Sequence, residues 1–477
     1  MSGVGGAGAV FWCERAWLPD GVAERVLVCC SSDGVVRSVR AGVCAPSGAT
    51  RLGGLVFPGF ANAHSHAFHR ALRGRTHAGG GTFWTWRDGM YRLAGALDPD
   101  RYYRLARLVY AEMLLAGYTA VGEFHYLHHP PDGGRYRDPN AMGLALVEAA
   151  RDAGIRLTLL DACYLAGGLD TTGYRPLDRT QARFGDQDVG DWLSRLSALV
   201  SAVPGGAAGP ESVPLNAVTG SESVPLNAVA ARIRVGAAVH SVRAVPADAL
   251  PTIAKFDPRL PLHLHLSEQP AENQACRAYH RCTPTELLAG AGLLRASTTA
   301  VHATHLTRTD IELLGVAGVT ACFCPSTEAD LADGIGPARE LADAGCPISL
   351  GSDQHAVIDA LGEARALEHG ERLRTGRRGR FGPAELVRAG TTHGYDALGW
   401  PGGGQLVAGA PADLTAVHTE TIRTAGARPE QLIMAATAAD VHTVVVGGEL
   451  VVSQGRHRTI GDVGAEMAGV IEELCRT

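Results

Sequence analysis

Eight short apolar segments, each ending in polar or ionisable residues, constrain the fold of this chain more than any other feature. The segments are residues 55–66, 118–126, 155–164, 233–241, 260–268, 298–306, 319–326 and 347–355. Helix-like segments such as 101–117, 140–154 and 283–292 lie between them. Alternating strands and helices favour parallel βα units. Eight such units predict an α/β fold with a closed (β/α)8 TIM-like barrel, in which chemistry occurs at the carboxyl ends of the strands.

The two ends of the chain differ from this pattern. Residues before about 57 and after about 402 form short β-branched runs separated by glycine turns. We expect these ends to pair with each other in one small β-sandwich, closed by an amphipathic helix over 457–477. The predicted domains are therefore a barrel over 58–401 and a small domain made of 1–57 and 402–477.

A tandem duplication interrupts the predicted barrel ahead of its fourth strand. The segment ESVPLNAVTGS at 211–221 is followed at once by ESVPLNAV at 222–229. A repeat as short as this indicates replication slippage rather than a function. We expect a mobile insertion in the loop.

Composition excludes several classes of protein. Of the 477 residues, 46% are hydrophobic and 19% are charged, as in ordinary globular enzymes. The net charge of −6 provides no general attraction to nucleic acid or to an anionic membrane. The 11 cysteines form no CxxC pair, which favours free thiols in a reducing compartment. With no signal-like start and no run long enough to span a membrane, we expect a cytoplasmic protein.

Histidines and acids stand at the predicted strand ends. His64 and His66 end the first strand, and alternation turns both imidazoles to the same side. Such a pair alone is weak evidence, because two core or surface histidines are the usual explanation. Here His265 ends the fifth strand, His302 lies near the end of the sixth, and Asp353 ends the eighth. Three imidazoles and a carboxylate suit Zn²⁺ or Fe²⁺ and leave room for a water molecule.

A carboxylate for proton transfer follows the fifth strand. Glu268 comes three residues after His265, where it could move protons between a metal-bound water and a substrate. His263 and His305 are rival ligands. We favour His265 because it lies nearer the strand end and forms an HxxE motif with Glu268. We favour His302 over His305 because it lies inside the strand-like run.

The order HxH, HxxE, His and SD resembles the amidohydrolase superfamily, in its single-metal deaminase branch. More narrowly, several segments resemble the N-formimino-L-glutamate deiminases, and this resemblance runs over roughly residues 8–460. The segments are PGFANAHSHAFHRALRG, TFWTWRDGMYRLA, GYTAVGEFHYLHH, HLHLSEQPAE and GSDQHAVIDALGEARALEHGERL. The metal set is common to many deaminases, whereas FWTWR and GEFHY are far more specific to this family.

The resemblance implies a function and a role for each matching position. It implies deimination of N-formimino-L-glutamate to N-formyl-L-glutamate and ammonia in histidine degradation, without an organic cofactor. One divalent metal, Zn²⁺ first and Fe²⁺ as the alternative, would be held by His64, His66, His265 and Asp353. Glu268, His302 and Asp353 would be the catalytic groups. The implied substrate-binding residues are His69, Arg87, Tyr126, His240 and Arg243, of which His69 departs from the Gln of some relatives.

The substrate class agrees with the charged residues of the chain. Formiminoglutamate is a small dicarboxylate, and Arg87 and Arg243 lie on predicted loops at the catalytic rim. Lys255 is the only lysine, so anion binding falls to arginine, whose planar fork grips a carboxylate at two points. Two alternatives stay open: a deaminase of another small imine or heterocycle such as guanine or cytosine, and a non-catalytic barrel scaffold. We expect a homodimer with no nucleic-acid or membrane partner.

Overall fold

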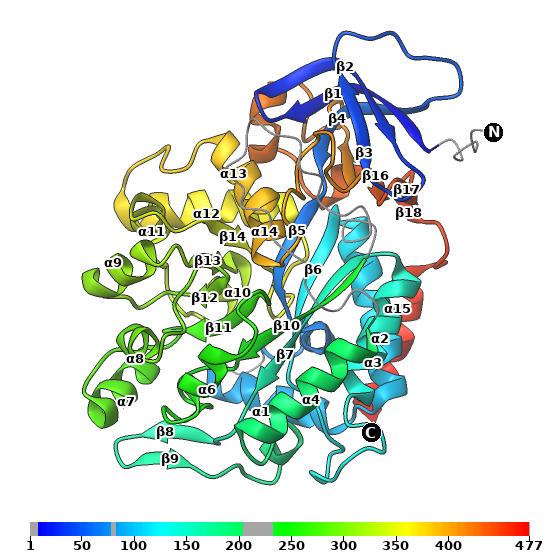
Figure 1. Ribbon diagram of the computed structural model, residues 1–477. Coiled ribbons are helices and arrows are strands. Elements are labelled where there is room, and N and C mark those ends of the chain that lie inside the picture. The colour runs from blue at the N-terminus through cyan, green and yellow to red at the C-terminus, as the bar shows by residue number, and fades with distance from the viewer. Residues whose placement is uncertain (1–7, 78–82, 204–231, 477) are drawn as a thin grey trace, which may run out of the picture.

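The computed structural model describes residues 8–77, 83–203 and 232–476 (Figure 1), so the tandem repeat at 211–229 lies outside them. One parallel sheet contains eight strands whose order in space follows the sequence. They are β5 (Phe60–Ser65), β6 (Tyr118–His125), β7 (Arg156–Cys163), β10 (Ile233–Val239), β11 (Leu262–Leu266), β12 (Thr298–His302), β13 (Thr320–Phe323) and β14 (Ile348–Leu350). A parallel bridge between Ser65 and Asp353 joins the first strand to the segment after the last. The predicted barrel is confirmed.

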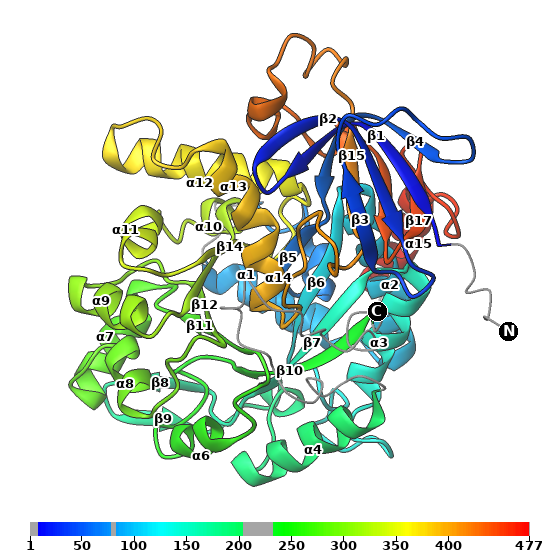
Figure 2. The ribbon, with the colours of Figure 1, turned by 45° about the horizontal axis from the view of Figure 1, so that its top comes forward.

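Helices surround this barrel, as Figures 1 and 2 show. In chain order they are α1 (Phe83–Gly95), α2 (Pro99–Leu115), α3 (Ala141–Ala153), α4 (Val189–Ala202), α6 (Leu250–Lys255), α7 (Pro270–His280), α8 (Pro284–Gly290), α9 (Arg308–Val316), α10 (Pro325–Asp330), α11 (Ala338–Asp343), α12 (Ala360–Thr375), α13 (Pro383–Gly390) and α14 (Thr392–Ala397). Every residue of β6, β7 and β10 is buried, because helices cover one face and the barrel interior fills the other.

Local sequence signals explain where some of these helices begin. At α8, the Thr283 hydroxyl accepts the Glu286 N–H, and the Glu286 carboxylate accepts the Thr283 N–H. Pro284 fills the first helical position, where its missing N–H is not needed. Thr307 and Asp310 cap α9 in the same reciprocal way. These caps orient the helices that follow β11 and β12, the strands that carry His265 and His302.

The first predicted strand is in fact parts of two strands. The run 55–66 divides at Gly59: β4 (Thr50–Pro58) belongs to the end sheet, and β5 begins the barrel. A Cβ at Gly59 would lie 2.1 Å from the Thr119 hydroxyl oxygen, so the chain changes sheets where only glycine fits. Both halves of the run are apolar and buried. The hydrophobic pattern therefore predicts one continuous strand where the structure has two.

Strands from both chain ends form the second eight-stranded sheet, with the order β18-β17-β16-β15-β4-β1-β2-β3. The remaining members are β1 (Val10–Leu18), β2 (Gly21–Cys30), β3 (Val36–Arg40), β15 (Leu414–Val417), β16 (Val441–Val446), β17 (Glu449–Ser453) and β18 (Arg456–His457). β1 and β4 are parallel, whereas β4 and β15, which join the two ends of the chain, are antiparallel. The expected β-domain made from both chain ends is confirmed, as one mixed sheet with a small apolar core.

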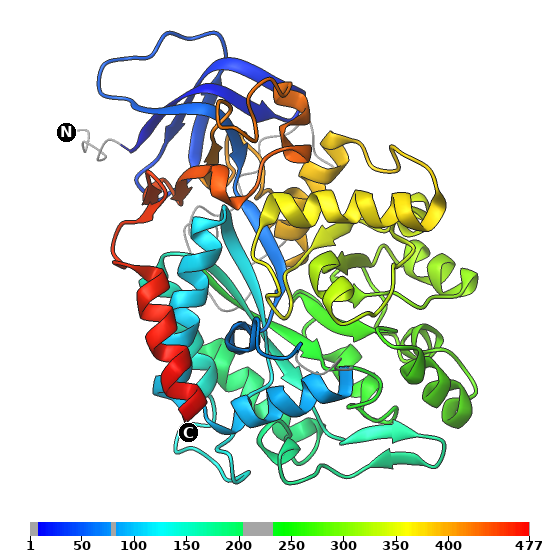
Figure 3. The same ribbon diagram turned by 180° about the vertical axis from the view of Figure 1, so that it is seen from behind.

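The closing helix packs on the barrel. It begins at Val463, later than the predicted start at 457, and forms α15 (Val463–Arg476). α15 lies beside α2, which Figure 3 shows from behind as a red helix against a cyan one. Arg104 of α2 pairs with Glu473 at 2.6 Å, and Arg107 pairs with Glu466 at 2.8 Å. The C-terminal segment therefore binds the outer surface of the barrel.

The chemistry of the cysteines and the length of the helices agree with the sequence analysis. The 11 cysteines are all free thiols, and seven of them are buried. Among the described residues, no helix combines the length and the apolar character needed to cross a membrane.

A buried ion pair connects the barrel to the end sheet. Arg156 at the start of β7 donates from Nε to Asp413 Oδ2 at 2.6 Å, and both side chains are 1% exposed. Asp413 also accepts the Tyr395 hydroxyl at 2.7 Å and the Gly447 N–H at 2.6 Å. This carboxylate therefore joins the barrel strand β7 and the barrel helix α14 to the loop between β16 and β17 of the small domain.

Removing the charge of Asp413 should destabilise the whole protein. In Asp413→Asn the Arg156 guanidinium stays buried without its counter-charge, which typically costs about 3–5 kcal/mol. We expect a clearly lower melting temperature, measured by circular dichroism. As a control, Arg308→Leu removes an exposed ion pair with Glu312 and should leave the melting temperature unchanged. Equal melting temperatures for Asp413→Asn and the parent would contradict this role.

Candidate functional site

Four side chains converge at the carboxyl end of the barrel. His64 and His66 come from β5 and the residue after it, His265 from β11, and Asp353 from the segment after β14. The Nε2 atom of His265 lies 3.1 Å from His64 Nε2 and 3.4 Å from His66 Nε2. Asp353 Oδ1 lies 3.4 Å and 3.3 Å from the same two nitrogens. Ligands about 2.0–2.2 Å from a zinc ion lie about 3–3.5 Å apart, so this group fits one ion.

The protonation of these imidazoles also fits a metal. The Nδ1–H of His66 donates to the Phe124 carbonyl at 2.9 Å, and that of His265 donates to the His240 carbonyl at 2.8 Å. Each bond leaves the Nε2 lone pair facing the centre of the group. Burial lowers the pKa of His64 to about 3, which keeps this ring neutral and able to coordinate. The four residues therefore match a divalent metal in geometry and in donor chemistry.

Glu123 of β6 holds the HxH segment in place. Its Oε2 accepts the Ser65 hydroxyl at 2.7 Å and its Oε1 accepts the Ala67 N–H at 2.6 Å. Burial raises the pKa of Glu123 to about 8, and these hydrogen bonds oppose the rise. The bonds fix the backbone on both sides of His66. This role was not predicted from the sequence, where its only signal is a carboxylate within an otherwise apolar strand.

The backbone at Asp353 adopts an unfavourable conformation. Asp353 has a φ of +38°, in the left-handed region that side-chain-bearing residues seldom adopt. Its N–H donates to the His64 carbonyl at 3.0 Å, and its own carbonyl accepts the His66 N–H at 3.1 Å. Such strain costs of order 1–3 kcal/mol and persists only where surrounding contacts impose it. Here those contacts aim the carboxylate at the three imidazoles.

Glu268 and His302 lie beside the ligand group. Glu268 Oε1 is 3.9 Å from His302 Nε2, and its other oxygen is 3.4 Å from an Arg243 nitrogen. His302 Nδ1 is 3.3 Å from Glu328, a residue that the sequence analysis did not single out. Burial lowers the pKa of His302, but Glu268, Glu328 and Asp353 together raise it well above its usual value. Glu268 and His302 therefore lie close enough to the ligand group to transfer protons there, and Glu328 holds the His302 ring.

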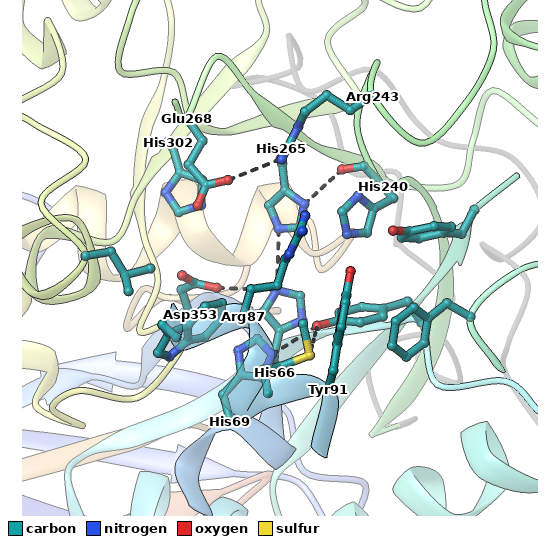
Figure 4. A pocket seen from close by; sticks show the side chains of 16 residues that line it. His66, His69, Arg87, Tyr91, His240, Arg243, His265, Glu268, His302 and Asp353 are labelled. Atoms are coloured by element: carbon teal, nitrogen blue, oxygen red, sulfur yellow. Dashed lines mark hydrogen bonds and ion pairs between the residues drawn. The ribbon is translucent and has the colours of Figure 1, made fainter. Parts of the chain in front are cut away.

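The expected substrate-binding residues surround the same cavity, which holds about 630 Å³ including its open mouth (Figure 4). The Tyr126 hydroxyl lies 3.0 Å from His69 Nε2. The His240 ring lies 5.1 Å from the His265 ring. The structure thus brings together the metal-fitting group, the proton-transfer group and the set His69, Arg87, Tyr126, His240 and Arg243.

The two arginines enter the cavity from different elements. Arg243 follows β10, and its Nε lies 2.9 Å from an oxygen of the buried Glu272. Arg87 belongs to α1, and its guanidinium lies over the Tyr91 ring at 5.5 Å from the ring centre. Glu272 and Tyr91 therefore orient the two guanidinium groups, and neither supporting residue was identified from the sequence.

Aromatic residues line most of the remaining wall. Tyr91 stands one helical turn after Arg87 on α1, so the FWTWRDGMYRLA segment contained a signal for it. Tyr164 and Phe184 come from the end of β7 and the long loop after it, and nothing in the sequence distinguished them from core aromatics. The other lining residues that the sequence analysis did not single out are Trp86, Met90 and Leu331.

The rival histidines lie outside the ligand group. His263 is one layer deeper in β11 than His265, and its Nε2 donates to the Ala397 carbonyl at 2.9 Å. His305 Nε2 donates to the Asp333 carbonyl at 2.8 Å. In both rings Nε2 is hydrogen-bonded to a backbone carbonyl and does not face the ligand group, which agrees with the preference for His265 and His302.

A parallel barrel that gathers these ligands at its strand ends defines a metal-dependent hydrolase. Residues 55–451 match the model of the amidohydrolase family, and the chain belongs to that family. Formimidoylglutamate deiminase of Pseudomonas aeruginosa is 36% identical over 94% of this chain and 96% of that protein. The crystal structure of an amidohydrolase from Brucella melitensis has a TM-score of 0.86 at 31% identity, covering 98% of this chain and 100% of that one. An adenosine deaminase from Xanthomonas campestris, solved with bound zinc, shares the fold with a TM-score of 0.78 at 21% identity, over 99% of both chains.

The ligand group makes a direct prediction about metal content. Elemental analysis of the purified protein should find one divalent ion per chain, and His66→Ala and Asp353→Asn should each lose it. His305→Gln changes a nearby imidazole outside the group and should retain the ion. Two ions per chain in the parent, or full metal content in Asp353→Asn, would contradict a single site built on these residues.

Proposed function

We propose that this protein is a formimidoylglutamate deiminase, which converts N-formimino-L-glutamate and water into N-formyl-L-glutamate and ammonia. One observation carries the proposal: Arg87 and Arg243 line the same cavity as the group that fits a metal. The 36% identity with the Pseudomonas aeruginosa enzyme over nearly the full chain supports it. Zn²⁺ is the proposed ion, with Fe²⁺ as the second candidate.

The arginines suit a substrate with two carboxylates. Arg243 is held through its Nε by Glu272, and one of its terminal nitrogens lies 3.4 Å from Glu268, which leaves the other terminal nitrogen to meet an anion at the cavity wall. Arg87 supplies a second positive charge from α1. A lysine would offer charge without the planar fork. Two oriented guanidinium groups therefore favour a dianion of glutamate size over a neutral base.

The reaction needs proton transfers that the cavity residues supply. A bound divalent ion lowers the pKa of a coordinated water molecule towards neutrality. Glu268 is the group that we propose to carry a proton to the terminal nitrogen of the formimino group. Asp353 assists in taking the proton from water, and His302, held by Glu328, orients the reacting groups from the other side. Oxygen is added to the formimino carbon, the bond from that carbon to its terminal nitrogen breaks, and ammonia leaves.

A second candidate is a deaminase of a small heterocycle, because aromatic rings line much of the cavity. Tyr126 and Tyr164 each pack against His240, with ring centres 5.5 Å and 4.6 Å apart. Such a wall could stack against a flat base. Ammonia release from formiminoglutamate, formiminoaspartate, guanine and cytosine, measured side by side, separates the two candidates.

Replacing Glu268 should separate binding from chemistry. Glu268→Gln preserves shape but cannot carry a proton, so turnover should fall by a factor on the order of 10² or more. Metal content and the KM for formiminoglutamate should stay near those of the parent. A variant whose kcat equals that of the parent would remove Glu268 from the mechanism.

Replacing Arg87 should test the substrate directly. Arg87→Met loses a charge-assisted contact, and kcat/KM should fall roughly 30-fold or more with no loss of metal. Arg92→Met, an exposed arginine on the same helix, is the matched control. Converting the contacted substrate carboxylate to its amide should harm the parent much more than Arg87→Met, as expected for direct partners. Normal kinetics in Arg87→Met would rule out this residue as a carboxylate ligand.

A further inference from the structure

A buried glutamine stands behind two tyrosines of the cavity wall. Gln181 lies in a short 3-10 helix, η2 (Gln181–Arg183), and is 4% exposed. Its Oε1 accepts the Asp178 N–H at 3.1 Å, which fixes the orientation of the amide group. Its Nε2 lies 3.2 Å from the Tyr91 hydroxyl, 3.3 Å from the Tyr164 hydroxyl and 3.0 Å from the Gly167 carbonyl. The amide nitrogen therefore faces three acceptors.

This arrangement decides what the two hydroxyls can do. A phenol has one hydrogen to donate and lone pairs with which to accept. The amide group has two hydrogens for these three acceptors, so one hydrogen is shared between two of them. Because Gln181 has only N–H groups on this side, both tyrosine oxygens act as acceptors towards it. Their own hydrogens are then left to point elsewhere. Tyr91 and Tyr164 both line the cavity that contains the metal-fitting group, so the cavity is where a partner for these hydrogens would lie.

The two hydroxyls lie in positively charged surroundings. Burial raises the pKa of Tyr164, and the guanidinium groups of Arg243 and Arg87 oppose that rise, so both charges act on this hydroxyl. Arg87 also lies over the ring of Tyr91, 5.5 Å from its centre. Two O–H donors beside two guanidinium groups form a surface suited to a carboxylate, which only accepts hydrogen bonds.

The distance from the metal-fitting group is also suitable. The Tyr164 ring is 4.6 Å from the His240 ring, and His240 is 5.1 Å from His265. One side chain therefore separates Tyr164 from a metal ligand. That spacing allows the formimino carbon to reach the metal while a carboxylate, a few bonds away, reaches the tyrosines.

We propose that Tyr91 and Tyr164, oriented by Gln181, donate hydrogen bonds to a carboxylate of the substrate and make the site select a carboxylate over an amide. This inference rests on the proposed function and assigns it two further binding residues. Gln181 is a positioning residue that acts through both tyrosines. A substrate amide has one acceptor oxygen in place of two, so its NH₂ group would face one of the O–H donors and leave that donor without an acceptor, which costs affinity.

Binding of the stable product, N-formyl-L-glutamate, tests the proposal without depending on turnover. In the metal-loaded protein, Tyr91→Phe and Tyr164→Phe should each raise its Kd by roughly tenfold in isothermal titration calorimetry. The KM for formiminoglutamate should rise by a similar factor, with kcat within about threefold of the parent. Tyr103→Phe removes an exposed hydroxyl that pairs with Asp152, and it should change neither value.

Gln181 has its own test. Gln181→Leu leaves the tyrosine hydroxyls free to turn and should also weaken product binding. In the Tyr91→Phe, Tyr164→Phe double variant the same Gln181→Leu change should add little, because the groups that it orients are gone. A structural role alone would make Gln181→Leu equally harmful in both backgrounds, and this result would overturn its assignment as a positioning residue.

The outcomes distinguish this inference from the proposed function. A parent that neither binds N-formyl-L-glutamate nor releases ammonia from formiminoglutamate overturns both. A parent that does both, with Tyr91→Phe and Tyr164→Phe equal to it in Kd and KM, overturns the tyrosine assignment alone. Preserved metal content and melting temperature in each variant show that the change acts on binding and not on folding.

Discussion

The seam between β5 and β14 is the contact on which the site depends. The His64 carbonyl accepts the N–H groups of Ser352 and Asp353 at 3.1 Å and 3.0 Å. Asn62 strengthens the same seam, because its side chain donates to the Ser352 hydroxyl at 2.6 Å and accepts the Ser352 N–H at 3.0 Å. His64 and Asp353 are ligands from opposite ends of the barrel sequence. The four-residue group therefore exists only when the first and last strands have met.

The two ends of the cavity differ in their electrostatic character. At the metal-fitting end, burial keeps the imidazole of His64 neutral, so Asp353 is the carboxylate that faces three uncharged nitrogens. At the other end, Arg243 and Arg87 lie among tyrosines. The carboxylate of Glu272 pairs with the Arg243 Nε and fixes the orientation of that guanidinium. A substrate with a basic, reactive nitrogen group at one end and anionic groups at the other fits this polarity in one orientation. Under the proposed function, this polarity aligns formiminoglutamate in the cavity before any chemistry begins.

The barrel and its ligand group could be predicted because both leave periodic marks in the sequence. Strand ends that carry His, HxxE and SD occur in a fixed order, and each of these residues lies within three residues of the observed strand end. Residues that support the cavity-lining side chains from outside the cavity have no such pattern in the sequence. Gln181 comes from the short 3-10 helix η2 and Glu328 from the short helix α10, so their approach depends on the tertiary fold and not on spacing. The Gly59 boundary was missed for a related reason, since both strands that meet there are buried and apolar.

The pairing of β4 with β15 has a consequence for how the chain is made. β1 to β4 leave the ribosome first, but one edge of β4 stays open until β15 appears, after the whole barrel has been synthesised. An unpaired edge with an apolar face is a template for aggregation. Arg156, too, is synthesised long before Asp413. The end sheet therefore cannot be completed until β15 has been synthesised, so its two halves depend on the barrel between them to bring them together.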